Sequence, residues 1–136
     1  MAVTNYQLSL QSATWVDANS RFTTGALPDR LPDVMAINNS LFNLFNCPVG
    51  ARGKIFQPEY GSEWYAFLQE PIDAITAMKM RISMIHAIQR WEPRLVLDFS
   101  NTSIVADPRL PGYKVTIAGI EVLTNTPLQI QFTEQL

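Results

Sequence analysis

The 136-residue chain is long enough for one domain with a buried core, and 47% of its residues are apolar. Only 16% are charged and the formal net charge is −2, which argues against a broad basic interface for nucleic acid. Cys47 is the only cysteine, which excludes an internal disulfide and a cysteine-based zinc cluster. The sequence has no signal peptide and no membrane-spanning apolar run, so we expect a soluble protein made in the cytosol.

Residues 1–32 are polar and mixed, without a sustained hydrophobic period. Their apolar side chains are Tyr6, Leu8, Leu10, Trp15, Val16 and Phe22. Because disordered tails rarely carry so many, we expect an N-terminal arm that packs on its own core or on a neighbouring subunit. A single domain is then predicted at residues 33–136.

Two to three helices are predicted between residues 33 and 91. Asp33 can cap a helix that runs to about Phe45, and a short helix is expected within residues 63–70. Asp73 can cap the longest helix, which runs to about Trp91. The expected core-facing residues of the first helix are Val34, Ile37, Leu41 and Leu44 or Phe45. The expected core-facing residues of the longest helix are Ile75, Met78, Ile82, Ile85 and Ile88 or Gln89.

The rest of the chain predicts strands. One strand begins at Leu95 and continues to about Ala106 with a kink near Asn101, and Gly119 allows a bulge in the next strand. Apolar residues alternate at Tyr113, Val115 and Ile117, and again at Leu128, Ile130 and Phe132. The expected fold is α+β, with an N-terminal arm, the helices, and then a small three-stranded antiparallel meander whose edges are open to another chain.

A charged junction, Glu92-Pro93-Arg94, follows the longest helix. Proline lacks an N–H and disfavours helical angles in the residue before it, so Glu92 should leave the helix and Arg94 should open an extended run. Residues two apart in an extended chain point to the same side. We therefore expect the Glu92 carboxylate and the Arg94 guanidinium to lie together, which suits docking better than catalysis.

Catalytic patterns are weak in this sequence. His86 lies within the long helix and is best interpreted as a packed or surface residue, and Cys47 as a small buried one. The segment Gly50–Gly53 lacks the lysine and hydroxyl residue of a phosphate loop. Two carboxylates could cleave a glycoside, and the candidates are Glu59, Glu63, Glu70 and Glu92. Their spacing selects no pair, so no catalytic, cofactor or metal residue is assigned.

Three segments together resemble the small baseplate wedge proteins of contractile phage tails. They are Gly50-Ala51-Arg52, Pro58-Glu59-Tyr60-Gly61-Ser62 and Glu92-Pro93-Arg94, and the resemblance covers about residues 33–122. The same family includes the corresponding component of type VI secretion baseplates and is often labelled lysozyme-like. This chain departs from it at Cys47, where threonine is common, and at Ala51, where an acidic residue is frequent.

The resemblance implies a structural protein of the virion tail baseplate, present in several symmetric copies and assembled in the host cytoplasm. Its implied partners are the tail sheath protein, which would add strands to it, and other wedge, hub or tube proteins; nucleic acid and membrane are not among them. It implies docking or bracing for Glu92, Pro93 and Arg94. The implied loop-shaping residues are Gly50, Pro58, Glu59, Tyr60 and Gly61.

Two other functions stay open at this point. One is a carboxylate-dependent peptidoglycan hydrolase delivered at the tail tip, and the other is the equivalent scaffold in a type VI secretion baseplate. If the chain is a baseplate wedge protein, we expect the arm at residues 1–32 to grip other wedge or hub proteins through Trp15 and Phe22.

Overall fold

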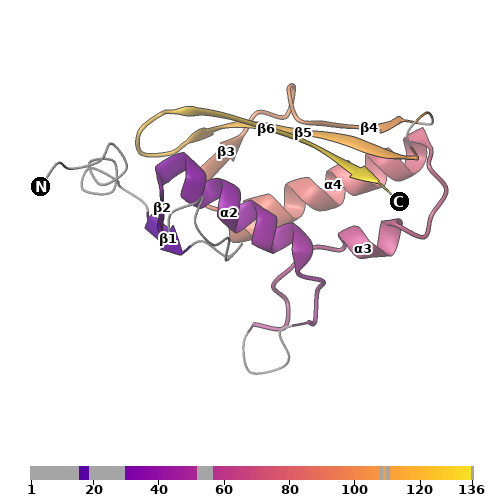
Figure 1. Ribbon diagram of the computed structural model, residues 1–136, viewed down its shortest axis with the longest axis horizontal. Helices are drawn as coiled ribbons and strands as arrows, with labels where there is room; N and C mark the ends of the chain where they lie inside the picture. Colours follow the sequence, from indigo (N-terminus) through magenta and orange to yellow (C-terminus); the bar gives the residue numbers. More distant parts are fainter. Residues whose placement is uncertain (1–15, 19–29, 52–56, 108, 110, 136) are drawn as a thin grey trace, which may run out of the picture.

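The computed structural model describes residues 16–18, 30–51, 57–107, 109 and 111–135. Its elements are β1 (Val16–Ala18), β2 (Arg30–Pro32), α2 (Asp33–Asn46), α3 (Trp64–Phe67), α4 (Ala74–Trp91), β3 (Leu95–Leu97), β4 (Ser103–Asp107), β5 (Gly112–Glu121) and β6 (Pro127–Gln135). Figure 1 shows the three helices on one side of the larger sheet, β3–β6, with the paired β1 and β2 beside the start of α2. The α+β class and the helix order are as predicted.

Strand β5 is the centre of the larger sheet. It pairs antiparallel with β6 from Gly112 opposite Gln135 to Ile120 opposite Pro127, without a break in register. The bulge predicted at Gly119 is therefore wrong. A Cβ at Gly119 would lie 2.5 Å from the Val96 carbonyl oxygen, so the glycine instead allows β3 to approach closely.

The predicted strand from Leu95 to Ala106 is two strands, β3 and β4, which makes four strands in the larger sheet instead of three. Both lie along the same edge of β5, separated by a turn at residues 98–102. The Asp98 carboxylate accepts hydrogen bonds from Asn101 Nδ2 at 2.6 Å and from the Ser100 N–H at 3.0 Å. The bond from the Asn101 side chain lowers the pKa of Asp98. These local polar contacts compete with strand pairing and end β3.

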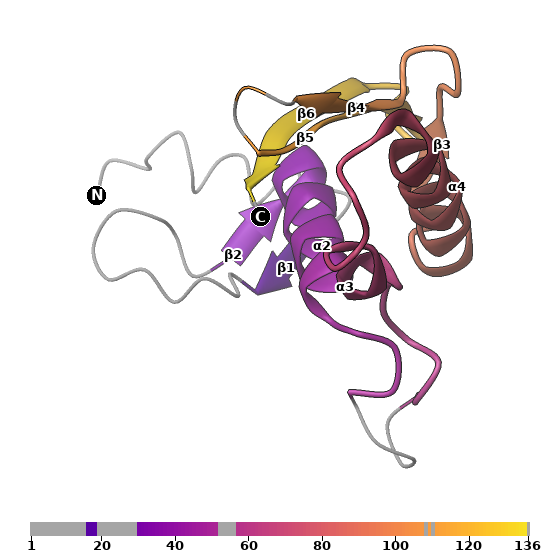
Figure 2. The ribbon, with the colours of Figure 1, turned by 90° about the vertical axis from the view of Figure 1, so that its right-hand side faces the viewer.

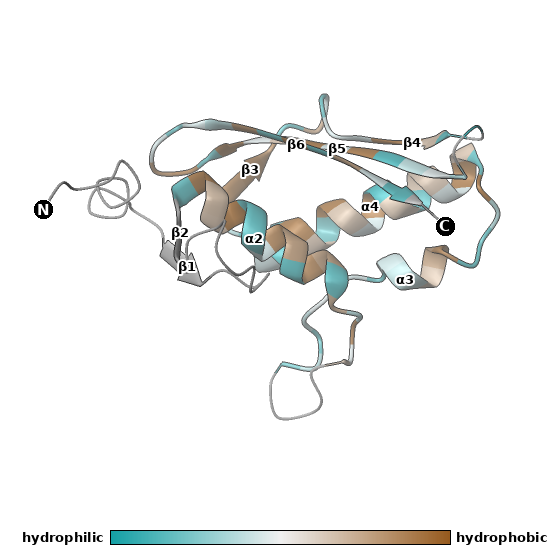
Figure 3. Ribbon diagram, in the orientation of Figure 1, coloured by the Kyte–Doolittle hydropathy of each residue, from teal (hydrophilic) through white to brown (hydrophobic). Residues whose placement is uncertain are grey.

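Helices α2 and α4 cover one face of the larger sheet, and the core lies between them and the sheet (Figure 2). The predicted alternation in β5 is confirmed, because Tyr113, Val115 and Ile117 are fully buried. The predicted face of α2 is also confirmed at Ile37 and Leu41, which are 0% and 2% exposed. In Figure 3, hydrophobic residues recur along the length of both α2 and α4.

The start of α4 is anchored at two points. The Asp73 carboxylate accepts a hydrogen bond from the Thr76 N–H at 2.7 Å, as predicted for the helix cap, and this bond lowers the pKa of Asp73. The Tyr113 hydroxyl donates to the Pro71 carbonyl at 3.2 Å, and burial raises the pKa of that phenol. The helix therefore begins in contact with the central strand.

The predicted core-facing stripe of α4 is largely wrong. Ile75, Met78 and Ile82 are 68%, 64% and 45% exposed. The buried residues of α4 are Thr76, Ala77, Met80, Met84, Ala87 and Ile88. Both stripes repeat at three- and four-residue intervals, so periodicity alone cannot say which one faces the sheet, and side-chain hydrophobicity favours the wrong one. No helix in the described part of the chain is long and apolar enough to span a membrane.

The corrected stripe predicts unequal effects for two substitutions in α4. Met80→Ala should lower the free energy of unfolding by about 2–5 kcal/mol, because Met80 is fully buried and its truncation leaves a cavity. Ile82→Ala should cost about 1 kcal/mol or less, because Ile82 is almost half exposed. Urea denaturation of both variants measures the difference, and equal losses would contradict this packing of α4.

Candidate functional site

The junction after α4 forms a closed ion pair. Glu92 leaves the helix with φ −124° and ψ 73°, while its N–H still donates to the Ile88 carbonyl at 2.8 Å. Arg94 donates through Nε and Nη2 to the two oxygens of Glu92, at 2.6 and 2.7 Å. The two groups lie together as predicted, in the two-bond geometry that guanidinium and carboxylate favour. Glu92 is 1% exposed, whereas Pro93 between them is exposed.

A second buried carboxylate, Glu121, lies at the end of β5 opposite Leu95. It accepts hydrogen bonds from the N–H groups of Leu123 and Thr124, at 3.1 and 2.6 Å, and so closes the turn that leads to β6. Sequence reasoning missed this residue. Its position in the sequence was the available signal. Glu121 comes four residues after Ile117, so in an extended strand its side chain lies on the same, buried face of the sheet.

The loop between α2 and α3 is closed by backbone hydrogen bonds. The Gly50 N–H donates to the Pro58 carbonyl at 2.8 Å, and the Ser62 N–H donates to the Cys47 carbonyl at 3.0 Å. Gly61 has φ +132°, and a Cβ there would lie 2.3 Å from the Cys47 carbonyl oxygen. Glycine is therefore required where the returning chain passes the end of α2.

The same loop contacts the end of α4. Glu59 forms an ion pair with Arg90, and the Tyr60 ring meets the Trp91 ring edge to face with centroids 5.2 Å apart. Arg90 also lies over the Trp91 ring, 5.0 Å from its centroid. The segment that contains Glu59 and Tyr60 thus contacts the last turn of α4, directly before Glu92.

The four candidate catalytic carboxylates are not gathered into one site. Glu92 is held by Arg94, and Glu70 pairs with Lys79 at 2.9 Å. Glu59 and Glu63 line a cavity of about 300 Å³ beside α4, together with the exposed His86. Glu59 is paired with Arg90 at its rim. In the described residues, no group of three or more His, Cys, Asp or Glu side chains could hold a metal ion.

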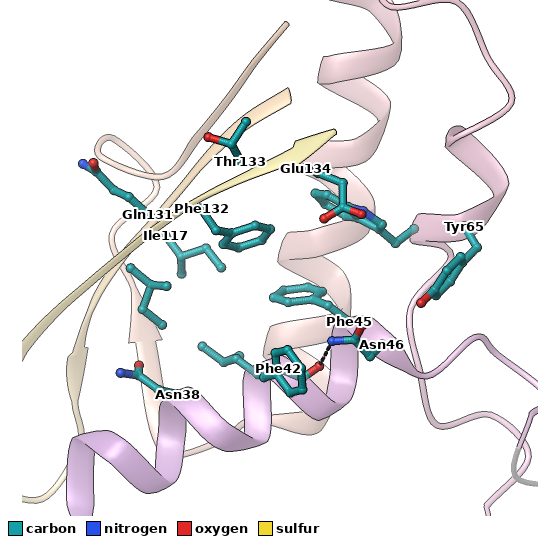
Figure 4. A pocket seen from close by; sticks show the side chains of 13 residues that line it. Asn38, Phe42, Phe45, Asn46, Tyr65, Ile117, Gln131, Phe132, Thr133 and Glu134 are labelled. Carbon is teal, nitrogen blue, oxygen red and sulfur yellow. Dashed lines mark hydrogen bonds between the residues drawn. The ribbon is translucent and has the colours of Figure 1, made fainter. Parts of the chain in front are cut away.

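A larger groove of about 430 Å³ lies between α2, α3 and β6, and sequence reasoning did not identify it (Figure 4). Phe45 forms its floor, with ring centroids 5.8 Å from Trp64 and 6.3 Å from Phe132. Phe42 and Tyr65 at its rim are 41% and 43% exposed. Its remaining lining residues are Asn38, Leu41, Asn46, Ile117, Ile130, Gln131, Thr133 and Glu134. It is thus a groove lined by both aromatic and polar side chains.

The outer edge of β6 borders this groove. The Glu121 N–H donates to the Thr126 carbonyl at 3.0 Å, so these two residues form a hydrogen-bonded pair. Hydrogen-bonded and non-hydrogen-bonded pairs alternate along β5 and β6 from this point. By the alternation of antiparallel strands, the backbone groups of Gln129, Gln131 and Thr133 then point away from β5. No described strand other than β5 pairs with β6. The other edge of β5, in contrast, is covered by β3 and β4.

One family model matches more than half of this chain. The family described as "Baseplate wedge protein gp25" matches residues 33–115. Baseplate protein W of Escherichia phage P2 is 26% identical over 98 residues, which cover 72% of this chain and 81% of that protein.

Two solved structures share the fold. A Geobacter sulfurreducens protein, named provisionally as a tail lysozyme, has a TM-score of 0.60 at 21% identity and covers 74% of this chain and 87% of its own. The baseplate of pyocin R2 after contraction contains a chain with a TM-score of 0.52 at 17% identity, covering 90% of this chain and 99% of its own. At these identities the likeness establishes the fold alone.

The buried ion pair predicts a stability effect. Arg94→Ala should lower the free energy of unfolding by about 3 kcal/mol, because it leaves the buried Glu92 carboxylate without its guanidinium. Arg109→Ala is the matched control: Arg109 is exposed, and its loss should change stability by about 0.5 kcal/mol or less. Chemical denaturation measures both, and a neutral Arg94→Ala would show that the pair does not brace this corner.

From the geometry of this loop we predict that alanine destabilises the protein more at Gly61 than at Gly50. Gly61→Ala should cost about 2–3 kcal/mol, since the new Cβ collides with the Cys47 carbonyl at a φ that only glycine adopts readily. Gly50→Ala should cost about 1 kcal/mol, because its φ is also positive but its Cβ meets open space. Thermal unfolding of the two variants distinguishes them, and equal shifts in Tm would be inconsistent with the close approach at Gly61.

Proposed function

The chain belongs to the baseplate wedge protein family, and on that premise we propose that it is a structural wedge component of a contractile tail. In this proposal it nucleates the tail sheath by offering the outer edge of β6 to a strand of the first sheath ring. The observation that carries the proposal is this edge itself, with outward backbone groups at Gln129, Gln131 and Thr133 beside an aromatic groove.

Strand addition has two requirements, and β6 meets both. Backbone N–H and C=O groups on the free edge supply affinity, and pockets for alternate side chains supply specificity. The added strand would place every second side chain toward the helices, next to Ile130 and Phe132 and into the groove. The edge formed by β3 and β4 is less suited, because the turn at residues 98–102 interrupts it.

The corner and the loop are proposed to hold this edge in position for neighbouring subunits. Glu92 is buried, so contact with a partner would fall to the exposed Pro93 and the part of Arg94 that remains accessible, while the ion pair braces the corner. Gly50, Pro58, Glu59, Tyr60 and Gly61 would shape the loop that ties α2 to the end of α4.

We also propose that the chain has no catalytic activity. A retaining or inverting glycosidase needs two carboxylates placed across the scissile bond. Of the two that line one cavity here, Glu59 is already paired with Arg90. Incubation of the purified protein with peptidoglycan should release no soluble fragments, and measurable hydrolysis that Glu59→Gln abolishes would overturn this part of the proposal.

The proposed partners are the tail sheath protein and the other wedge, hub or tube proteins, with several symmetric copies of this chain in each baseplate. Nucleic acid and membrane are not proposed partners. Assembly would take place in the host cytoplasm before incorporation into the virion tail.

Reconstitution tests the sheath role directly. Baseplates assembled with and without this chain are mixed with tail tube and purified sheath protein, and ordered sheath is counted by electron microscopy. We expect sheath only when the chain is present. Equal sheath in both mixtures would reduce the chain to a wedge brace that has no part in nucleation.

A variant then tests the edge. Gln131→Pro removes an outward N–H in the middle of the free edge, where proline is tolerated, so folding should persist while sheath nucleation is lost. Gln131→Ala keeps the N–H and serves as the control. Normal nucleation by a folded Gln131→Pro variant would place the sheath contact elsewhere.

A further inference from the structure

Helix α4 has a second apolar stripe on the side that faces away from the core. This outer stripe consists of the exposed Ile75, Met78 and Ile82, the partly buried Ile85, and the exposed Gln89 at its polar end. Figure 2 shows α4 at one border of the molecule, with the sheet above it and α2 and α3 on its inner side. A helix that is apolar on two sides is typical of a helix that is buried on both.

The outer stripe lies nearly opposite the buried one. Met80 is fully buried and Ile82 is exposed. Two residues that are two positions apart are separated by about 200° around an α-helix. The outer stripe is therefore a separate surface and not the margin of the core. Its large apolar side chains follow one another along the helix, whereas surface hydrophobic residues that need no explanation are scattered singly.

The spacing of the outer stripe indicates what kind of element fits it. From Ile75 to Gln89, successive members are three, four, three and four residues apart. This is the seven-residue repeat of a coiled coil, in which two positions of each heptad face a partner helix. Over this distance the stripe rises about 21 Å, which is about four turns of a helix.

The stripe of α4 that packs on the sheet is broader. Its buried residues include adjacent pairs and are Thr76, Ala77, Met80, Met84, Ala87 and Ile88. A narrow stripe with only two positions per heptad is the form that coiled-coil helices use, whereas a broad one is usual for a helix on a globular core. The outer stripe therefore fits another helix better than it fits a second sheet.

The charges beside the outer stripe define the partner further. The titratable side chains of α4 are Lys79, Arg81, His86 and Arg90, and the helix contains no Asp or Glu. Lys79 and His86 border the stripe on one side, and Arg81 borders it on the other. Lys79 pairs with Glu70 at 2.9 Å, whereas Arg81 donates to two backbone carbonyls, which carry no net charge. The outer stripe thus has basic borders.

A second copy of this chain would fit these borders poorly. If two copies packed through α4, the basic residues beside both stripes would approach one another, and like charges placed together oppose binding. Acidic residues at the bordering positions of the partner would instead complement Lys79 and Arg81. The fitting partner is therefore a helix of a different protein.

We propose that the outer stripe of α4 packs lengthwise against an amphipathic helix of another protein, one with apolar residues in heptad spacing and Asp or Glu on both borders. This surface is separate from the edge proposed for the sheath, because no residue of α4 lines the groove beside β6. The proposal goes beyond the sheath contact and does not depend on it.

Two fluorescent peptides test this surface on the isolated full-length chain. Each has three heptads with Ile and Leu at the two apolar positions, and the bordering positions are Glu in one peptide and Lys in the other. Fluorescence anisotropy measures the Kd of each peptide. We expect the Glu peptide to bind about tenfold more tightly than the Lys peptide or better, and its binding should weaken as salt is added.

Substitutions then locate the contact. Ile82→Glu places a negative charge in the middle of the outer stripe and should weaken binding of the Glu peptide by about tenfold or more. Met78→Glu, at a more exposed position, repeats the test if Ile82→Glu fails to fold. Val105→Glu is the matched control, because Val105 is an exposed apolar residue of β4, and it should bind the peptide as the wild type does. Urea denaturation verifies that each variant is folded.

Three results would overturn the proposal. They are no binding of the Glu peptide to the wild type, equal binding of the Lys peptide, and unchanged binding by the folded variants at Met78 and Ile82. A dimer in light scattering that Ile82→Glu abolishes would assign the outer stripe to a second copy and would also overturn it. The sheath assay is independent, because peptide binding with normal nucleation by Gln131→Pro would reject the sheath contact at β6 and keep this surface.

Discussion

The buried pair of Glu92 and Arg94 is the constraint on which the arrangement of the described domain depends. Proline at 93 forces the chain out of α4, and the two-bond contact fixes the angle at which the next residues leave. Because Glu92 is almost fully buried, its charge is compensated only while Arg94 holds this geometry. Leu95 then enters the sheet opposite Glu121, at the far end of β5.

The loop after α2 also contacts the end of α4. Glu59 and Tyr60 contact Arg90 and Trp91 in the last turn of α4, so the end of that helix is held by the loop on one flank and by the ion pair on the next. The loop segment with Glu59 and Tyr60 and the junction at Glu92 therefore both lie at the end of α4 and organise one corner of the fold. Such a corner can position a subunit rigidly against its neighbours without any chemistry.

The strands on the two sides of β5 form different outer edges of the larger sheet. On one edge, the turn at residues 98–102 separates β3 from β4, and Arg81 of α4 fixes it by donating to the carbonyls of Thr102 at 2.9 Å and Phe99 at 2.7 Å. On the other, β6 continues for nine residues beside the aromatic groove. Irregularity protects the first edge, whereas in our proposal a strand of the sheath protein covers the second.

Local patterns in the sequence determined the three helices and where several elements end, but not the division of residues 95–107 into two strands. Caps and prolines act within a few residues, so the start of α4 at Asp73, its end before Pro93, and the pairing of Glu92 with Arg94 were all predictable. Only the tertiary structure decided which of two equivalent stripes of α4 faces the sheet, because Ile82 and Met80 obey the same periodicity. It also brought Phe45, Trp64 and Phe132 together into a groove, since contacts between residues so far apart depend on packing and leave no local trace in the sequence.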